Sequence, residues 1–405
     1  MDVVCDTLMV EEILPRLPPK DLLRLGAASR RYNALVLDPD LAARYWRRPR
    51  AGVFFQPRLF STEPLPRFLS GGHGHKHATE LVSGADLSFL PGPSAREKDY
   101  LRRIDARDTG RVAVVLHSAA GLLLCSRGSV RPMHFYVCNP VTWQWVALPE
   151  LPRPPAAWIY GLLRVDTDEG GGVKCFQVVV FHHSMHWQYE GAGFDLRLFS
   201  SDTGRWEAMQ FELPLVVEDA IVPPAILGLS GTAYWIRCQY RDTAMAYNCA
   251  NHSVQIIPLP KCLFDGAFKR TIGELPGGGL RYAHANSSVF EVWDSKEGGG
   301  NIVMWMLVHR VGVAELLEQN PEAHALFCDE PTTTRGDYPA PMGFHPTDED
   351  IVFVNMPGSI FAYSMEHGTM NLQCTHDAYS RPPYMFPYVH PHHLVQIPAI
   401  NNSIP

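Results

Sequence analysis

Hydrophobic positions near the start of the chain follow a helical period. Val10, Ile13, Leu14 and Leu17 are spaced i, i+3, i+4, i+7, which places them on one face of a helix. Pro15 falls inside this pattern, and a proline within a helix removes a backbone donor and clashes with the preceding turn. We therefore expect the first helix to end or kink near Leu14.

Further short helices are expected before residue 48, so this segment is predicted to be all-α with three to four helices. Proline suits the first helical position, so Pro18-Pro19 can begin the second helix. Asp38-Pro39 ends the third helix and caps a short fourth. The apolar positions of these helices are Leu22, Leu25, Tyr32, Leu35, Val36, Leu41 and Tyr45.

A unit this small buries its apolar residues poorly on its own. Leucines left at the surface form the kind of patch that marks a partner-binding site. The alternative is that the helices form a cap that packs on the rest of the chain. The hydrophobic pattern alone does not decide between these two interpretations.

From residue 49 onward the pattern changes to short apolar runs separated by turn residues. Asn, Asp, Gly and Pro supply the conformations that hairpin turns need, as at Asp202-Thr203-Gly204 and Glu366-His367-Gly368. A pair of hairpins recurs about every 40–50 residues, which favours a β-propeller of six or seven blades over several small β domains. The apolar runs are Gly121–Cys125, Phe135–Pro149, Leu196–Pro214, Gly231–Cys238, Ala244–Pro260, Ser287–Asp294 and Ile351–Cys374.

The predicted organisation is therefore a helical domain at 1–48 followed by an all-β propeller at 49–398, with two insertions. The insertion near 71–80 is a glycine- and histidine-rich segment. The insertion near 311–335 contains apolar residues at helical spacing from Val311 to Cys328.

Composition and charge narrow the classes of function. The net charge of −7 lacks the basic excess of a nucleic-acid binder, and no apolar run is long enough to span a membrane. The N-terminus has no basic region of a signal peptide, and nine cysteines without a C-x-x-C pair are typical of reduced thiols. We expect a protein of the cytoplasm and/or nucleus.

No catalytic constellation is recognisable in the sequence. The P-loop, dinucleotide-binding, H-E-x-x-H and G-x-S-x-G motifs are all missing, and Gly228–Gly231 is better interpreted as a β-turn than as a nucleophile elbow. Most cysteines lie in apolar strands, where burial keeps thiols inert. The chain is thus not expected to be an enzyme.

Half of the histidines form three clusters. Residues i and i+2 of a strand share a face, so neighbouring histidines could reach one metal ion. No cysteine or carboxylate nearby completes a ligand set, so we expect no metal and no cofactor. The clusters are His73/His75/His77, His182/His183/His186 and His390/His392/His393.

The first helices resemble an F-box. Three features differ from the usual motif: no leading Leu-Pro pair, Pro15 in the first helix, and Tyr32 where tryptophan is common. The missing pair belongs, in that family, to the adaptor contact. The matching residues are Glu12-Ile13-Leu14, Leu17-Pro18, Lys20-Asp21-Leu22, Arg24, Ser29-Arg30-Arg31 and Asp38-Pro39.

The remainder, from about Gly121 to Cys374, resembles the F-box-associated repeat domain of plants, which is related to kelch propellers. Each matching piece is short, and it is their order along the chain that makes the resemblance specific. The pieces are Ala233-Tyr234-Trp235, Ala246-Tyr247-Asn248, Ile257-Pro258-Leu259-Pro260, Glu291-Val292-Trp293 and His345-Pro346-Thr347-Asp348.

These resemblances imply a substrate-recognition subunit of an SCF-type (Skp–cullin–F-box) ubiquitin ligase. The helices would dock on a Skp-type adaptor, and through it on a cullin, while the propeller binds an unknown protein substrate. The alternatives are a propeller scaffold acting outside a ligase with a degenerate F-box and, on fold analogy alone, a propeller enzyme or sugar-binding protein. Candidate residues for adaptor contact, or for the core beneath it, are Leu8, Ile13, Leu14, Leu17, Pro18, Leu22, Leu25, Leu35, Leu41 and Tyr45.

Substrate binding is expected on propeller loops at one end of the central channel, because loops on a rigid scaffold commonly carry recognition. Tryptophan in a repeated blade is more often a packing residue, so none of the candidate residues is assigned. The aromatic and basic candidates are Trp143, Trp158, Trp187, Arg237 and Arg241.

Overall fold

The computed structural model describes most of the chain. The described residues are 5–17, 19–36, 38, 41, 50–56, 66–71, 82, 84–92, 113–127, 134–152, 159–168, 172–182, 193–212, 226–236, 242–261, 269–298, 302–329, 338–376, 384–391 and 395–400.

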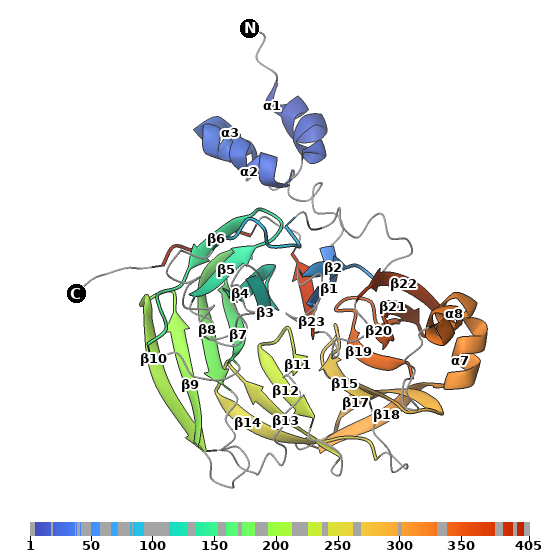
Figure 1. The fold of residues 1–405 in the computed structure, drawn as a ribbon. Coiled ribbons are helices and arrows are strands. Elements are labelled where there is room, and N and C mark those ends of the chain that lie inside the picture. The colour runs from blue at the N-terminus through green and yellow to red at the C-terminus, as the bar shows by residue number, and fades with distance from the viewer. Residues whose placement is uncertain are drawn as a thin grey trace.

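Six antiparallel sheets form the blades of a β-propeller, as Figure 1 shows. Blade 1 consists of β1 (Arg50–Gln56), β2 (Arg67–Leu69) and β23 (Tyr384–His390). Blade 2 consists of β3 (Ala113–Ala119), β4 (Leu122–Arg127), β5 (His134–Asn139) and β6 (Gln144–Ala147). Blade 3 consists of β7 (Ile159–Thr167), β8 (Val173–His182), β9 (Gly193–Ser200) and β10 (Arg205–Glu212).

The remaining three blades also have four strands each in chain order. Blade 4 consists of β11 (Ile226–Leu227), β12 (Thr232–Ile236), β13 (Thr243–Asn248) and β14 (Ser253–Pro258). Blade 5 consists of β15 (Lys269–Glu274), β16 (Leu280–Ala285), β17 (Val289–Gly298) and β18 (Ile302–Gly312). Blade 6 consists of β19 (Ala340–Phe344), β20 (Ile351–Met356), β21 (Ser359–Ser364) and β22 (Thr369–Thr375).

The propeller predicted from the repeating hairpins is confirmed, and its blade number is six. The possibility of seven blades was wrong, because the first and last strands belong to one shared blade. β23 pairs with β1 over seven residues, from Arg50↔His390 to Gln56↔Tyr384. The strands β3, β7, β11, β15, β19 and β23 lie innermost, around the centre of the ring (Figure 1).

Burial follows the position of a strand within its blade. The middle strands β4 and β21 are buried at every residue, since neighbouring blades cover both of their faces. In the outer strand β6, by contrast, exposed and half-buried residues alternate. The apolar core therefore consists of layers between successive blades, and each blade contributes side chains to two layers.

The turn residues act as the sequence predicted. Asp202-Thr203-Gly204 connects β9 to β10, and Gly204 has a φ of 64°, which glycine adopts without steric cost. The Glu366–Gly368 turn connects β21 to β22 in the same way, with a φ of 66° at Gly368. The Gly228–Gly231 segment is the predicted β-turn, closed by a hydrogen bond of 3.1 Å from the Gly231 N–H to the Gly228 carbonyl.

Short helices precede the propeller and lie outside the ring in Figure 1. The first is irregular: after one α-helical turn comes a π-helical turn, and Pro15 lies in a 3₁₀ turn that ends it. Of the expected fourth helix, only Leu41 is among the described residues. The elements are α1 (Asp6–Leu8), η1 (Met9–Ile13), η2 (Leu14–Arg16), α2 (Pro19–Ala28) and α3 (Arg30–Val36).

The helical insertion predicted near 311–335 is confirmed as α7 (Val313–Gln319) and α8 (Pro321–Asp329), which connect blade 5 to blade 6. Val313, Leu316 and Leu317 are buried and join the apolar layer between these blades. The other predicted insertion, near 71–80, lies outside the described residues except for Gly71.

None of the helices among the described residues is long and apolar enough to cross a membrane.

Candidate functional site

The N-terminal helices enclose a small apolar core of their own. Its buried members are Met9, Leu14, Leu22, Val36 and Leu41. Burying five such side chains stabilises the unit only modestly, because each contributes about 1.5–3 kcal/mol before the entropy of ordering the chain is subtracted.

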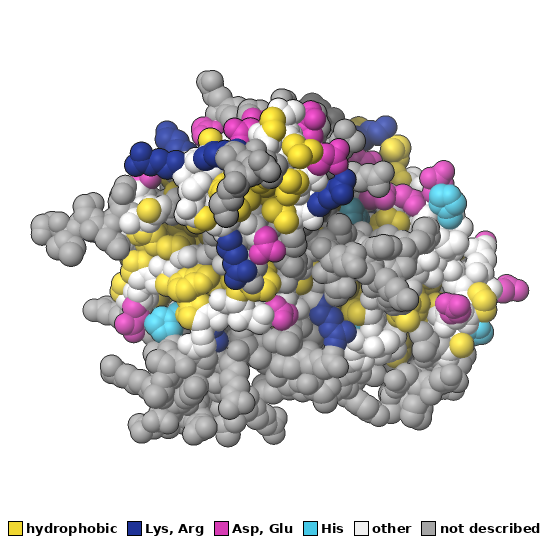
Figure 2. Space-filling view, turned by 90° about the horizontal axis from the view of Figure 1, so that it is seen from above, with side chains coloured by type: hydrophobic (Ala, Val, Ile, Leu, Met, Phe, Trp, Pro, Cys, Tyr) yellow, Lys and Arg dark blue, Asp and Glu magenta, His cyan; other side chains and the backbone are white. Residues whose placement is uncertain are grey.

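Two large apolar side chains of this unit point away from that core. Leu8 is 49% exposed and Ile13 is 37% exposed. They lie five residues apart on the irregular first helix. Figure 2, which views the molecule from the side of these helices, shows hydrophobic side chains at the surface between acidic and basic ones.

The structure separates the predicted adaptor-contact residues into three groups. Leu14, Leu22 and Leu41 are buried in the core, whereas Leu8 and Ile13 are exposed. Three more leucines are half-buried against the core, and two of the predicted residues lie outside those whose side chains are described. The half-buried ones are Leu17, Leu25 and Leu35, and the undescribed ones are Pro18 and Tyr45.

Polar contacts fix the arrangement of these helices. The Arg31 guanidinium Nε donates to Asp6 Oδ1 at 2.9 Å, which holds α3 against α1. Ser29 precedes α3, and its Oγ accepts from the Tyr32 N–H at 3.2 Å, a typical N-cap. Asp38 Oδ1 accepts from the Leu41 N–H at 3.4 Å, in the position predicted for a fresh cap.

A small cavity lies among the inner strands of the propeller. A cavity of about 40 Å³ lies between β11, β15, β19 and β23, and its wall includes Ile226, Ile272, Phe344 and Met385. A space of this size holds a few water molecules, whereas pockets for small ligands measure about 300–1,000 Å³. Of the described residues, those lining this space do not form a small-molecule site.

Glu274 closes one end of this region by holding the β11–β12 turn. Its Oε2 accepts from the Ser230 N–H at 2.8 Å, and its Oε1 accepts from the Tyr234 hydroxyl at 2.9 Å. Burial, with the nearby Glu274 carboxylate, raises the pKa of Tyr234 well above its usual range. Tyr234 therefore acts as a permanent hydrogen-bond donor.

His117 ties three blades together at the same place. The Leu163 N–H donates to its Nδ1 at 2.9 Å, so the proton lies on Nε2, which donates to the Gly228 carbonyl at 2.9 Å. Burial lowers the pKa of His117 to about 4. A neutral histidine with a hydrogen bond at each ring nitrogen is a structural residue and not a general base for catalysis.

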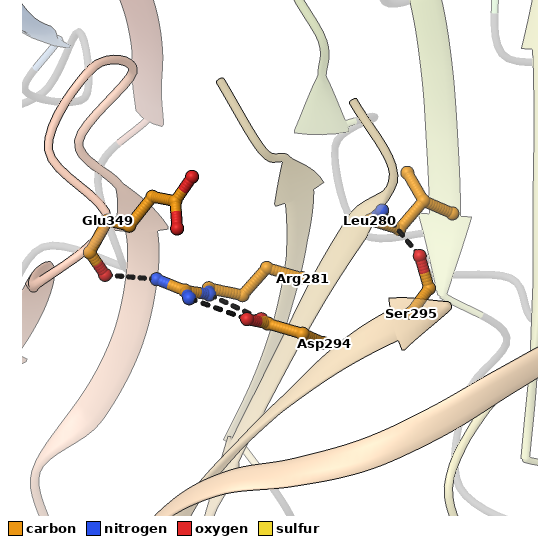
Figure 3. Close-up of polar contacts among 5 residues, drawn as sticks. All are labelled: Leu280, Arg281, Asp294, Ser295 and Glu349. Atoms are coloured by element: carbon orange, nitrogen blue, oxygen red, sulfur yellow. Dashed lines mark hydrogen bonds and ion pairs between the residues drawn. The ribbon is translucent and has the colours of Figure 1, made fainter. Parts of the chain in front are cut away.

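Arg281 joins blade 5 to blade 6, as Figure 3 shows. Its Nε and Nη2 donate to the two oxygens of Asp294 at 2.6 and 2.7 Å, a bidentate pair in which the arginine side chain is only 5% exposed. Its Nη1 donates to the Glu349 carbonyl in the loop between β19 and β20. No sequence motif indicated these contacts, because Asp294 and Glu349 lie 13 and 68 residues away from Arg281.

The residues that resemble the plant repeat domain are also structural. Trp235 is buried in the core, and the Glu291 carboxylate lies 3.2 Å from His284 Nε2 and 3.3 Å from Arg310 Nε. His345 Nδ1 accepts from the Asp348 N–H at 3.0 Å, which shapes the β19–β20 turn. Burial lowers the pKa of His345.

Most of the unassigned aromatic and basic candidates for substrate binding lie outside the described residues. Only Trp143 is described, at a turn where its ring stacks on Phe89 with 5.9 Å between centroids. It therefore packs on the protein itself. The undescribed candidates are Trp158, Trp187, Arg237 and Arg241.

The histidine clusters cannot be assembled into a site from the described side chains. His390 is buried at the end of β23, and the side chains of the other eight are not described. A different grouping of possible ligands, Asp350, Glu366 and His367, lies at the β21–β22 turn. Its Asp350 carboxylate already accepts from the Glu366 N–H at 2.6 Å and from the Ser364 hydroxyl.

Of the six cysteines whose side chains are described, five are buried and all six are free. Burial raises the pKa of Cys249 and of Cys374 to about 11. These thiols stay protonated near neutral pH, and the predicted burial of cysteines in strands is confirmed for these positions.

The sequence interpretation missed an exposed apolar strand, β18. Met304, Met306, Leu307 and Val308 are between 39% and 57% exposed at the outer edge of blade 5. The available signal was a run of seven apolar residues in an outer strand, where alternation with polar residues is the rule.

Comparison with known proteins agrees with this architecture. Residues 97–380 match the family model described as "F-box protein At3g26010-like, beta-propeller". F-box protein At5g03970 of Arabidopsis thaliana is 24% identical over 366 residues, covering 88% of this chain and 79% of that protein. F-box protein At3g26010 of the same plant is 27% identical over 252 residues, covering 60% of this chain and only 53% of its own length.

Solved structures resemble the chain more distantly. A protein from Lactobacillus plantarum matches 68% of this chain and 88% of its own, with 9% sequence identity and a TM-score of 0.35. That score is too low to carry an argument. The family model, in contrast, covers five of the six inner strands and ends before β23. The chain therefore belongs to the At3g26010-like F-box protein β-propeller family.

Proposed function

We propose that the chain is the substrate-recognition subunit of an SCF-type ubiquitin ligase. Its N-terminal helices would dock on a Skp-type adaptor and, through it, on a cullin, while the propeller binds a target protein. The observation that carries this proposal is the pair of exposed apolar residues, Leu8 and Ile13, on helices that already have a core of their own. Membership in a family of F-box propeller proteins supports the same assignment.

The chemistry of such a subunit is positional. It brings a substrate close to a ubiquitin-charged enzyme and so raises the effective concentration of substrate lysines. Neutral His117 and bidentate Arg281 hold blades together, and neither is arranged for proton transfer to a substrate. The proposal therefore assigns no catalytic residue to this chain.

The test is binding of the full chain to a purified Skp-type adaptor. Leu8→Asp with Ile13→Asp changes two exposed residues and spares the core, unlike a change at buried Leu22. We expect the double variant to bind at least about 30-fold more weakly, since two central apolar contacts contribute about 2 kcal/mol or more.

The matched control is Trp145→Asp, which changes a side chain that is 44% exposed on the propeller. It should bind the adaptor as the unchanged chain does. If the unchanged chain does not bind, or if the double variant binds equally well, the ligase assignment is wrong.

A second candidate is a propeller scaffold that acts outside a ligase. The irregular first helix favours it, because the π-helical turn and the 3₁₀ turn at Pro15 rotate successive side chains away from a regular helix face. Under this alternative the full chain captures partners without any adaptor or cullin among them.

The proposed location is the cytoplasm and/or nucleus, where reduced thiols are normal. A fluorescent fusion of the full chain tests it, and accumulation in the secretory pathway would contradict it.

A further inference from the structure

The outer strand of blade 5 carries an extended apolar surface. Met304 is 57% exposed, Met306 is 43% exposed, and Leu307 and Val308 are each 39% exposed. The run from 302 to 308 contains no charged residue. Outer strands of soluble proteins normally include charged residues that prevent contact with other strands.

The backbone of β18 is also open on one side. The strand pairs with β17, and in the described sheet no strand follows it, so alternate N–H and C=O groups point outward. Trp293 pairs with Leu307 and Val292 pairs with His309, which leaves Val308 as the extra residue of a β-bulge. The regular edge therefore extends from Ile302 to Leu307.

Contacts with both neighbouring blades hold this edge in place. On one side, the Trp305 indole N–H donates to the Pro258 carbonyl of blade 4 at 2.6 Å. On the other, His309 Nε2 lies 2.9 Å from the Tyr363 hydroxyl of blade 6. An edge that is already ordered loses little conformational entropy when another strand pairs with it.

We propose that this edge binds β18 of a second copy of the chain, in an antiparallel pair across a two-fold axis. A two-fold axis perpendicular to the sheet keeps the side chains of both copies on the same face. The sequence numbers of two residues that lie opposite each other must therefore differ by an even number. With the axis at Trp305, Met304 lies opposite Met306 and Val303 lies opposite Leu307.

Charge complementarity favours a second copy over a charged partner segment. Every pair in this register is apolar with apolar, and Arg310, the first charged residue of the strand, lies beyond the paired run. A charged segment would place its charges against apolar side chains, which costs desolvation energy without any compensating pair. A strand as uncharged as β18 itself avoids that cost.

The size of the patch sets the strength of the association. It consists of four partly exposed side chains, Met304, Met306, Leu307 and Val308. A standard interface buries about 800 Å² per partner, so the dimer is expected to be weak and dependent on concentration.

Sedimentation velocity of the full chain over a range of concentrations tests the proposal. The mass should rise from 45.3 kDa toward twice that value. Met304→Lys with Met306→Lys should weaken association at least about tenfold, because the new lysines of one copy would lie opposite those of the other. Amide exchange within 302–307 should slow as the concentration of the unchanged chain rises.

Two controls make the result specific to β18. Trp145→Lys on blade 2 should leave the dimer unchanged, as should Leu8→Asp with Ile13→Asp on the N-terminal helices. The second control also separates this inference from the proposed adaptor contact, on which it does not depend. A chain that is monomeric throughout, a dimer that both lysines leave intact, or a monomer that binds an apolar peptide at this edge would each overturn it.

Discussion

Blades 5 and 6 have the same four-stranded construction but differ at their outer edges. At the edge of blade 6, the Met370 N–H of β22 donates to Asn320 Oδ1 at 2.7 Å. Asn320 Nδ2 in turn donates to the Gly368 carbonyl at 2.9 Å and to the Leu316 carbonyl at 2.8 Å. At the edge of blade 5, β18 instead presents apolar side chains to solvent.

The connection between the two blades produces this difference. The chain leaves β18 at Gly312 and enters α7 directly, where the Val313 N–H donates to the Ser288 carbonyl of blade 5 at 3.0 Å. The two helices then pack beside blade 6 (Figure 1), so the insertion protects the edge of blade 6, whereas Met304 and Met306 at the edge of blade 5 stay exposed. In these two blades, the segment that connects them determines which outer strand edge is protected, and the sheets themselves do not.

The largest effect is expected from breaking the contact that joins the two blades. Arg281→Met removes the bidentate partner of Asp294, whose side chain is only 17% exposed, and leaves a poorly hydrated carboxylate. We expect a loss of about 3–5 kcal/mol in the free energy of unfolding, measured by denaturant titration.

Arg310→Met is the matched control for this change. Arg310 also pairs with a carboxylate of blade 5, Glu291, at 3.3 Å, but its side chain is 62% exposed. The expected loss is about 0–1 kcal/mol. Equal losses for the two variants would show that burial does not determine the strength of these pairs.

Acid should weaken blade 5 through His284. Burial and the nearby Arg270 lower the pKa of this histidine to about 4, whereas an unfolded histidine titrates near 6.5. Above pH 6.5 neither state is protonated, so this contribution to stability is constant. As the pH falls from about 6.5 toward 4 the unfolded state takes up the proton first, and at most about 3 kcal/mol is lost.

Thermal melts of the unchanged chain and of His284→Gln at several pH values measure this effect. The variant should have the flatter pH dependence. His324→Gln, at an exposed position of α8, should keep the pH dependence of the unchanged chain. A His284→Gln profile parallel to the unchanged one would contradict the assignment.

Asn320→Ala should uncover the protected edge of blade 6. The change leaves the Met370 N–H and the Gly368 carbonyl without the amide that binds them, and we expect a loss of about 2 kcal/mol in the free energy of unfolding. Gln319→Ala, at the preceding and exposed position, should change stability by less than about 0.5 kcal/mol. Faster amide exchange at Met370 in the Asn320 variant alone would identify the edge as the site of loss.

The smallest effect on stability is expected at the open edge of blade 5. Met304→Lys and Met306→Lys replace side chains that are already largely exposed, so each should change the free energy of unfolding by less than about 0.5 kcal/mol. A loss of several kcal/mol would show that these residues contribute to the core and would remove the contrast between the two blades.

The local features of the propeller could be predicted from the sequence. The turns at Gly204 and Gly368 need a left-handed backbone conformation, and a glycine within a cluster of polar residues predicts such a turn. The insertion that forms α7 and α8 was visible because apolar residues change from a period of 2 to a period of 3.6.

Contacts between distant segments could not be predicted in this way. His117 bonds to Gly228, 111 residues away, and no local pattern records which blades become neighbours. The blade number depended on the pairing of β23 with β1, which joins the two ends of the propeller. Of the candidate site, the sequence identified the set of leucines, but only the packing separates exposed Leu8 from buried Leu14.

The shared blade has a consequence for synthesis on the ribosome. β1 emerges more than 300 residues before β23, the strand that completes its pairing, so Val53, Phe54 and Phe55 can pair only with β2 in the meantime and the other edge of β1 stays open. At about 5–20 residues per second, that delay is on the order of 20–60 s. Throughout that interval the nascent chain exposes an unpaired strand edge that can pair with other chains. We therefore expect the nascent chain to need a chaperone until its last residues leave the exit tunnel.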